Sequence, residues 1–180
     1  MKPRLSFYVL AASLMWSAAP HAQSIPHVTA KSLNGKVVTL PADFAGKPAV
    51  LIVGFSKAGG EQCGPFARRL AKEQPGPVGH GLLIYQIAML ESAPRLIRGL
   101  IVHGIRGGVP QGAQDRFLPL FEDENQWKQV AGFTRSDEKD AYLLLVDPDG
   151  TVRWRGHGPY SETLYNQLIG QLEIIKLPGQ

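Results

Sequence analysis

The chain contains one cysteine, Cys63, which is its side chain best suited to covalent chemistry. A single cysteine excludes an intrachain disulfide, a Cys-x-x-Cys redox pair and every metal site that needs several cysteines. The thiol can still act as a nucleophile where a helix N-terminus or a neighbouring cation lowers its pKa. Arg68, Arg69 and Arg98 are cations that could serve it in this way. The alternative, which we expect, is a partly buried and inert thiol on a helix.

Five arginines are candidate binding residues and fall into two groups: Arg95, Arg98 and Arg106, and Arg153 and Arg155. The second group alternates with Val152 and Trp154, so both arginines lie on one face of a strand and could bind a carboxylate or a phosphate. The simpler interpretation is a solvated strand face with Trp154 packed inward. The first group accompanies an expected helix over residues 93–105, whose isoleucines share one face. This helix could face a membrane or a client protein, and the simpler interpretation is a helix docked on a sheet.

No histidine or glycine motif indicates a metal or a cofactor. His80, His103 and His157 are isolated, and none has a second ligand three or four residues away. Gly59-Gly60 is not followed by the Gly-Lys-Ser/Thr that completes a phosphate-binding loop. We therefore predict neither a metal nor a cofactor.

The composition is that of a globular domain. The chain has 180 residues, of which 44% are hydrophobic and 19% charged, enough for one domain with an accessory segment. The net charge is +4, but Lys2 and Arg4 lie in an N-terminal leader, and without them 17 basic residues oppose 15 acidic ones. A small net charge with interspersed signs is not typical of a nucleic-acid-binding surface. We predict no nucleic-acid partner.

Residues 1–22 have the pattern of a secretory signal peptide. A basic start precedes an uncharged, mostly apolar run over residues 5–19, and small residues follow up to Ala22. This run is shorter than the ~20 residues of a membrane-spanning helix. We therefore predict an exported, periplasmic protein in which residues 23–180 form a single domain. The alternative is an uncleaved leader that anchors the chain in the inner membrane, facing the periplasm, and membrane association is expected only in that case.

The remaining patterns predict an alternating α/β chain. Three apolar runs are typical of strands buried on both faces: residues 49–55, 81–90 and 141–146. Turn signals at Asn34-Gly35 and Asp147-Pro-Asp-Gly150 predict two hairpins. A polar loop is expected at 56–62, helices at 66–73, 93–105 and 162–175, a short strand at 116–121 and a short helix at 124–130. This order predicts an α/β fold, a thioredoxin-like three-layer sandwich with a central mixed sheet and an added N-terminal hairpin.

Two stretches of the sequence resemble known families. Ser32-Leu-Asn-Gly and the following residues up to Val-Gly-Phe55 are similar to the N-terminal part of periplasmic thioredoxin-like and peroxiredoxin-like families. In the second half, residues 91–98, Gly108-Val-Pro110, Arg116 and the 141–156 hairpin resemble the ATP synthase assembly-factor family of mitochondria. This resemblance spans residues 50–168 and implies a thioredoxin-like domain that assists the assembly of a membrane complex. That family works from the matrix side, whereas the leader predicts export, so the resemblance implies the fold rather than the same client.

The redox groups of a thioredoxin-like enzyme are incomplete in this chain. Such an enzyme needs an attacking thiolate at a helix N-terminus, a second thiol three residues on and a cis-proline beside them. With Phe55 aligned to the phenylalanine before the usual active-site loop, Gly60 stands at the attacking position and Cys63 at the second one. In another register, Cys63-Gly-Pro-Phe66 is the motif with its second cysteine replaced. Ala141 stands where the cis-proline would be, so the dithiol reaction is not available.

These observations predict a non-catalytic exported protein of thioredoxin-like fold that binds a protein client. The resemblance implies that it is an assembly factor or chaperone for a membrane or envelope complex, with the five arginines as a possible binding surface. The alternative is a one-cysteine thiol peroxidase or redox enzyme that uses Cys63. In that case Gly60 and Ser56 stand where a peroxiredoxin has the proline and threonine that hold the peroxide. A small-molecule binder at Arg153 and Arg155 is a third hypothesis.

Overall fold

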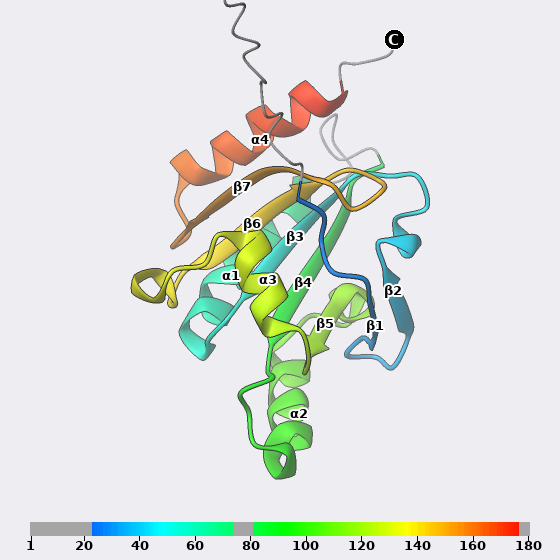
Figure 1. The fold of residues 1–180 in the computed structure, drawn as a ribbon, viewed down its shortest axis with the longest axis vertical. Helices are drawn as coiled ribbons and strands as arrows, with labels where there is room; N and C mark the ends of the chain where they lie inside the picture. Colours follow the sequence, from blue (N-terminus) through cyan, green and yellow to red (C-terminus); the bar gives the residue numbers. More distant parts are fainter. Residues whose placement is uncertain (1–22, 74–80, 177–180) are drawn as a thin grey trace, which may run out of the picture.

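A five-stranded sheet in the order β5-β4-β3-β6-β7 forms the centre of the computed structural model (Figure 1). The structure describes residues 23–73 and 81–176, so the predicted signal peptide lies outside the described residues. The strands are β3 (Ala49–Gly54), β4 (Leu83–Met89), β5 (Phe117–Leu120), β6 (Ala141–Val146) and β7 (Val152–Gly158). β3, β4 and β5 run parallel, whereas β6 is antiparallel to both of its neighbours. The sheet is therefore mixed, as predicted.

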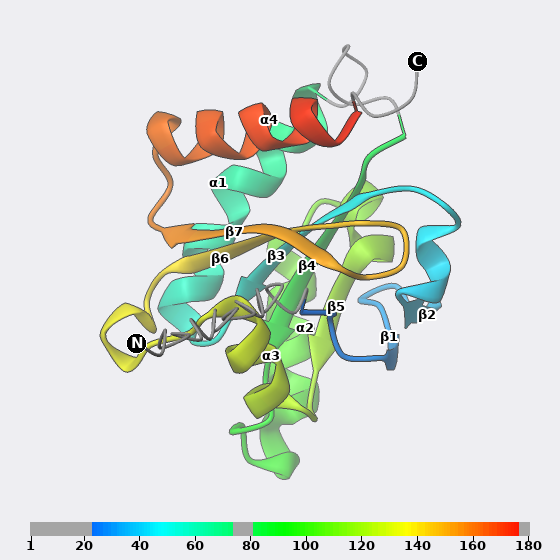
Figure 2. The ribbon, with the colours of Figure 1, turned by 45° about the horizontal axis from the view of Figure 1, so that its top comes forward.

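Both faces of the sheet are covered, and this explains the continuous apolar sequences of β3 and β6. One face packs against α1 (Lys57–Glu73) and α4 (Glu162–Lys176), and the other against α3 (Glu124–Ala131). Leu51 and Val53 of β3 share a core with Trp127 of α3, whereas the alternate residues Val50 and Ile52 pack in the core of α1 and α4. Figure 1 shows α3 in front of the sheet and α1 behind it, and Figure 2 shows α4 above β7. The predicted three-layer α/β sandwich is confirmed.

An N-terminal hairpin is added to the sandwich as a separate two-stranded sheet. It consists of β1 (Val28–Lys31) and β2 (Val37–Leu40), paired antiparallel. Gly35 in its turn has a φ of 91°, a left-handed conformation that glycine adopts without steric cost. The Leu33 N–H donates to the Phe117 carbonyl at 3.0 Å and so attaches the hairpin to the edge of the main sheet. The predicted hairpin is confirmed.

The first helix of the sandwich is longer than the sequence predicts. α1 begins at Lys57, so most of the polar segment 56–62, expected as a loop, forms its first turns. Glycines have low helix propensity, and the sequence therefore indicated a loop. The loop prediction was wrong because a side-chain cap fixes the start of the helix. The Ser56 hydroxyl accepts a hydrogen bond from the Gly59 backbone N–H at 3.0 Å, which satisfies a donor that the helix itself leaves unpaired.

The second predicted helix does not cover the sheet. It corresponds to α2 (Arg98–Gly108) and the 3₁₀ turn before it, and no residue of either is buried. Figure 1 shows α2 at one end of the molecule, beyond β4 and β5. The sheet is covered instead by α3, with Trp127, Val130 and Ala131 buried. The expectation of a docked helix at 93–105 was therefore wrong: Ile97 is exposed, and Ile101 and Ile105 are only half-buried.

Four 3₁₀ turns complete the described elements: η1 (Ala42–Phe44), η2 (Arg95–Ile97), η3 (Gln111–Arg116) and η4 (Arg135–Asp137). None of the described helices is both long and apolar enough to span a bilayer.

Candidate functional site

Cys63 lies on the inner face of α1, within the core that α1 and α4 share. Its side chain is 3% exposed and packs in the same cluster as Phe66 and Leu70 of its own helix. The thiol donates a hydrogen bond to the Gly59 carbonyl at 3.2 Å, one helical turn back. The burial is complete rather than partial, so an incoming peroxide or disulfide has no direct path to the sulfur.

Burial also sets the protonation state of this thiol. Loss of hydration raises the pKa of Cys63 from its ordinary value of 9.0 to about 12. Two of the three arginines considered as partners are held elsewhere, since Arg69 pairs with Glu73 and Glu162, and Arg98 donates to backbone carbonyls beside α2. At neutral pH the sulfur is therefore a thiol, whereas nucleophilic attack needs a thiolate.

The position of an attacking thiol is taken by Gly60, in the first turn of α1. A side chain built on Gly60 would meet no atom within 4 Å, so this position opens into free space. Its neighbour Gly59 is packed tightly, and a Cβ there would lie 2.6 Å from the Asp140 carbonyl oxygen. Ser56 links the same two segments, because its hydroxyl caps α1 and also donates to the Glu138 carbonyl at 2.8 Å in the loop before β6. The helix start is thus attached to the loop before β6, with no thiol at its surface.

The position expected for a cis-proline is Ala141, the fully buried first residue of β6. Among the described residues the only cis peptide bond precedes Pro41, so the bond before Ala141 is trans. The structure therefore brings Gly60, Cys63 and the start of β6 to one end of the sheet, as the sequence predicts, with two of the three redox groups replaced.

A polar cluster at this end of the sheet was not predicted from the sequence. Asp137, Asp140 and His157 have ligand atoms within 4.8 Å of one another. The His157 Nδ1 and the Asp140 carboxylate lie 2.9 Å apart, and the His157 ring stacks on Tyr142. Long sequence separation hid the cluster, but the hairpin register that pairs Tyr142 with His157 could have indicated it. The His157 ring and the Asp140 carboxylate already bind each other, and no further feature of the described residues indicates a bound cation. We therefore assign no metal to this cluster.

Arg153 and Arg155 lie on the exposed face of β7, while Trp154 packs toward α1 and α4 over Gly156. Each arginine has a partner within the chain. Arg153 pairs with Asp147, and Arg155 donates to the side-chain oxygen of Gln23 at 3.1 Å. Their role in binding an outside group stays a prediction.

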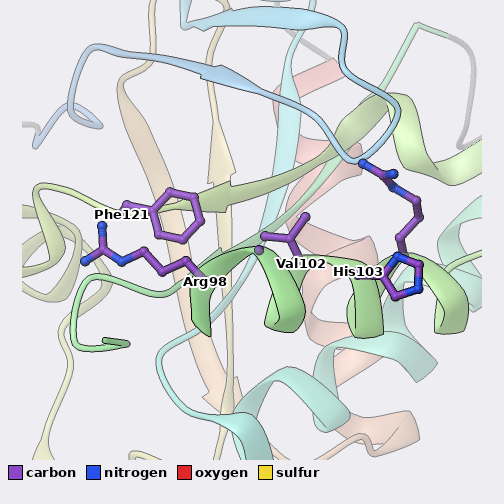
Figure 3. Close-up of a pocket in the computed structure, with 6 residues that line it drawn as sticks. Arg98, Val102, His103 and Phe121 are labelled. Carbon is purple, nitrogen blue, oxygen red and sulfur yellow. The ribbon is translucent and has the colours of Figure 1, made fainter. Parts of the chain in front are cut away.

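The other arginine group lies on α2 and on the 3₁₀ turn before it, at the end of the molecule beyond β4 and β5 (Figure 1). Beside α2 is a hollow of about 510 Å³, lined by Arg98, Gly99, Val102, His103, Arg106 and Phe121. Figure 3 shows Arg98 beside the Phe121 ring, with Val102 and His103 further along the helix. The Arg98 guanidinium lies 4.9 Å from the Phe121 centroid and donates to the carbonyls of Glu91 and Ala93. Arg98 therefore braces the start of α2.

The described residues form a three-layer α/β sandwich of thioredoxin-like fold that contains one buried cysteine. The chain matches no protein-family model and no curated protein sequence. Among solved structures it is similar to a Chlorobium tepidum protein assigned as the thiol:disulfide interchange protein DsbE, with a TM-score of 0.59, 17% identity, and coverage of 85% of this chain and 95% of that one. These values confirm the predicted thioredoxin-like fold.

Two further structures share the same arrangement. The exposed lipoprotein thioredoxin Etrx1 from Streptococcus pneumoniae has a TM-score of 0.56 and 11% identity, over 81% of this chain and 99% of its own. BsSco, a member of the Sco family of cytochrome c oxidase assembly proteins, has a TM-score of 0.54 and 14% identity, over 89% and 98%. At these identities the similarity is one of fold, and the finer resemblance to ATP synthase assembly factors stays a prediction.

Proposed function

We propose that this protein is a non-catalytic member of the thioredoxin-like class that binds a protein client. The observation that carries the proposal is the pair of positions 60 and 63. Gly60 occupies the accessible place of the attacking thiol, and the only thiol is buried with its pKa raised to about 12. A layout that keeps the fold and lacks an accessible thiolate suits binding better than thiol exchange.

The client is proposed to be a subunit of a membrane or envelope complex, and the protein an exported assembly factor or chaperone for that complex. The sequence resemblance to ATP synthase assembly factors and the signal-like residues 1–22 support this role. BsSco, which has a similar fold, belongs to a family of cytochrome c oxidase assembly proteins. A protein of this fold is therefore suited to assisting the assembly of a complex. The exposed face of β7, with Arg153 and Arg155, is the proposed client surface.

Turnover assays test the non-catalytic part of the proposal. Purified protein is mixed with hydrogen peroxide or with a disulfide substrate and a reductant, and substrate loss is followed over time. We expect wild type to match the Cys63→Ala variant, and neither to exceed the uncatalysed rate. The Gly60→Cys variant is the matched comparison, because it places a thiol at a position open to solvent, and this thiol should be oxidised by peroxide. Wild-type turnover that disappears in Cys63→Ala would support the one-cysteine enzyme instead.

Photo-crosslinking in cells tests the client. A photoreactive amino acid replaces Arg153 in one variant and the exposed Asn166 of α4 in the control variant. The expected result is one discrete protein adduct at position 153 and none at position 166, and the adduct should map to a subunit of an envelope complex. Equal labelling at both positions, or no adduct at position 153, would contradict the proposed surface.

A further inference from the structure

The outer face of α2 and its preceding turn exposes three large apolar side chains. Leu96 is 99% exposed, Leu100 73% and Ile97 44%, whereas only two other large hydrophobic residues of the described chain are comparably exposed. A solvent-facing helix surface normally carries polar residues, and a concentration of apolar side chains there marks a place where the helix meets another apolar phase.

The geometry of the helix makes these side chains protrude. Leu96 lies in the 3₁₀ turn before α2 and Leu100 in the first turn of α2, and both side chains are largely exposed to solvent. Gly99, Gly104 and Gly107 lie nearby on the helix and have no atoms within 4 Å of where a Cβ would be. The half-buried Ile101 and Ile105 lie toward the body of the protein. The leucines thus stand above a bare helix surface, at an end of the molecule that projects from the sheet (Figure 1).

The charged residues of the segment that carries these leucines, residues 92–114, are all basic. Between Glu91 and Asp115 the sequence contains no acidic residue. Arg95 and Arg106 are exposed, and Arg106 and His103 line the hollow beside the helix. Apolar side chains flanked by arginines are the pattern of a helix that lies in the interface of an anionic membrane, where the cations meet the headgroups.

We propose that the outer face of α2, defined by Leu96, Ile97 and Leu100 with Arg95 and Arg106 at its sides, docks on an anionic lipid surface. A second copy of the chain fits poorly, because it would bring like charges together without an intervening acid. The exposed leucines form a convex surface, and a bilayer yields around such a surface. The docking goes beyond the proposed client binding and does not depend on it.

Fluorescence of a site-specific label tests this docking in the full chain, leader included. The Leu96→Cys variant is labelled with an environment-sensitive nitrobenzoxadiazole group, and Cys63 stays unlabelled because it is buried. The matched control is Ile174→Cys, since Ile174 is 60% exposed on α4. We expect the label at position 96, and not at position 174, to shift to the blue with phosphatidylcholine vesicles that contain phosphatidylglycerol, and not with phosphatidylcholine alone.

Charge variants then separate the cationic contribution. With the label at position 96, the double change Arg95→Gln and Arg106→Gln should weaken binding to anionic vesicles roughly 25-fold, or about fivefold per charge. Vesicle binding without a shift at position 96 would mean that the leader alone attaches the chain, and it would overturn the proposal. A shift that grows with protein concentration in the absence of lipid would identify a second copy as the occupant and would also overturn it.

Discussion

The reactivity of Cys63 gives the sharpest test of the proposed site. Burial raises its pKa from 9.0 to about 12. At pH 8 a thiol with the ordinary value is about one-tenth ionised, whereas one with a pKa three units higher is roughly one ten-thousandth ionised. Since the thiolate is the reacting species, alkylation of the folded protein should be about a thousandfold slower than alkylation of the unfolded chain.

The assay measures iodoacetamide incorporation by mass spectrometry, from about pH 7 to about pH 10, in native buffer and in denaturant. The expected native rate is slow across this range and rises with pH without reaching a plateau. A native rate within about tenfold of the denatured rate, with an apparent pKa at or below the ordinary 9.0, would refute the structural argument. It would also restore the one-cysteine enzyme as the leading hypothesis.

Three further predictions concern stability. The folded protein favours the protonated Cys63, so this contribution to stability is complete below about pH 9 and is lost between pH 9 and 12 by about 1.4 kcal/mol per pH unit. Denaturant titrations at high pH should therefore show a steeper loss of stability for wild type than for Cys63→Ala. Parallel losses would contradict the burial of the thiol. Gly59→Ala should destabilise the fold by about 2 kcal/mol or more, because its Cβ would lie 2.6 Å from the Asp140 carbonyl oxygen. Gly60→Ala has open space around its Cβ and should stabilise α1 by up to about 1 kcal/mol. Equal urea midpoints for the two variants would show that the backbone at Asp140 moves to accept the Gly59→Ala methyl group. Ser56→Ala should cost about 1–2 kcal/mol through loss of the cap on α1, measured by the same unfolding curves, and an unchanged midpoint would argue that water replaces the hydroxyl.

The sheet was predictable because the sequence pattern of its strands indicates how each strand is buried. β3 and β6 are continuous apolar runs, and only a strand covered on both faces accommodates such a run. The Asn34-Gly35 turn likewise fixed the N-terminal hairpin, since two adjacent residues that tolerate left-handed backbone conformations are a local signal. These features depend on neighbours in the sequence, so local reasoning reaches them.

The helices were harder, because a helical pattern does not say which surface the helix meets. Residues 93–105 have a regular isoleucine spacing, yet α2 leaves that face half-buried and projects its leucines outward. The short α3 covers the sheet instead, through the fully buried Trp127. Connectivity alone does not decide this, because a helix in the crossover between the parallel strands β4 and β5 would usually pack on the sheet.

By itself, the sequence determined the α/β class and the succession of most elements along the chain, and it established that a dithiol reaction is unavailable, because one cysteine cannot make a pair. Only the tertiary structure decided the state of that cysteine. The packing of α1 against β3 and β6 removes water from Cys63 and raises the pKa of its thiol, and β6 lies about eighty residues from Cys63 in the chain. The meeting of Asp140 with His157, and the exposure of Leu96 and Leu100, are likewise set by how distant elements pack. The type of a residue limits the reactions that it can perform. The fold sets its solvation and its partners, and these decide which of those reactions can occur.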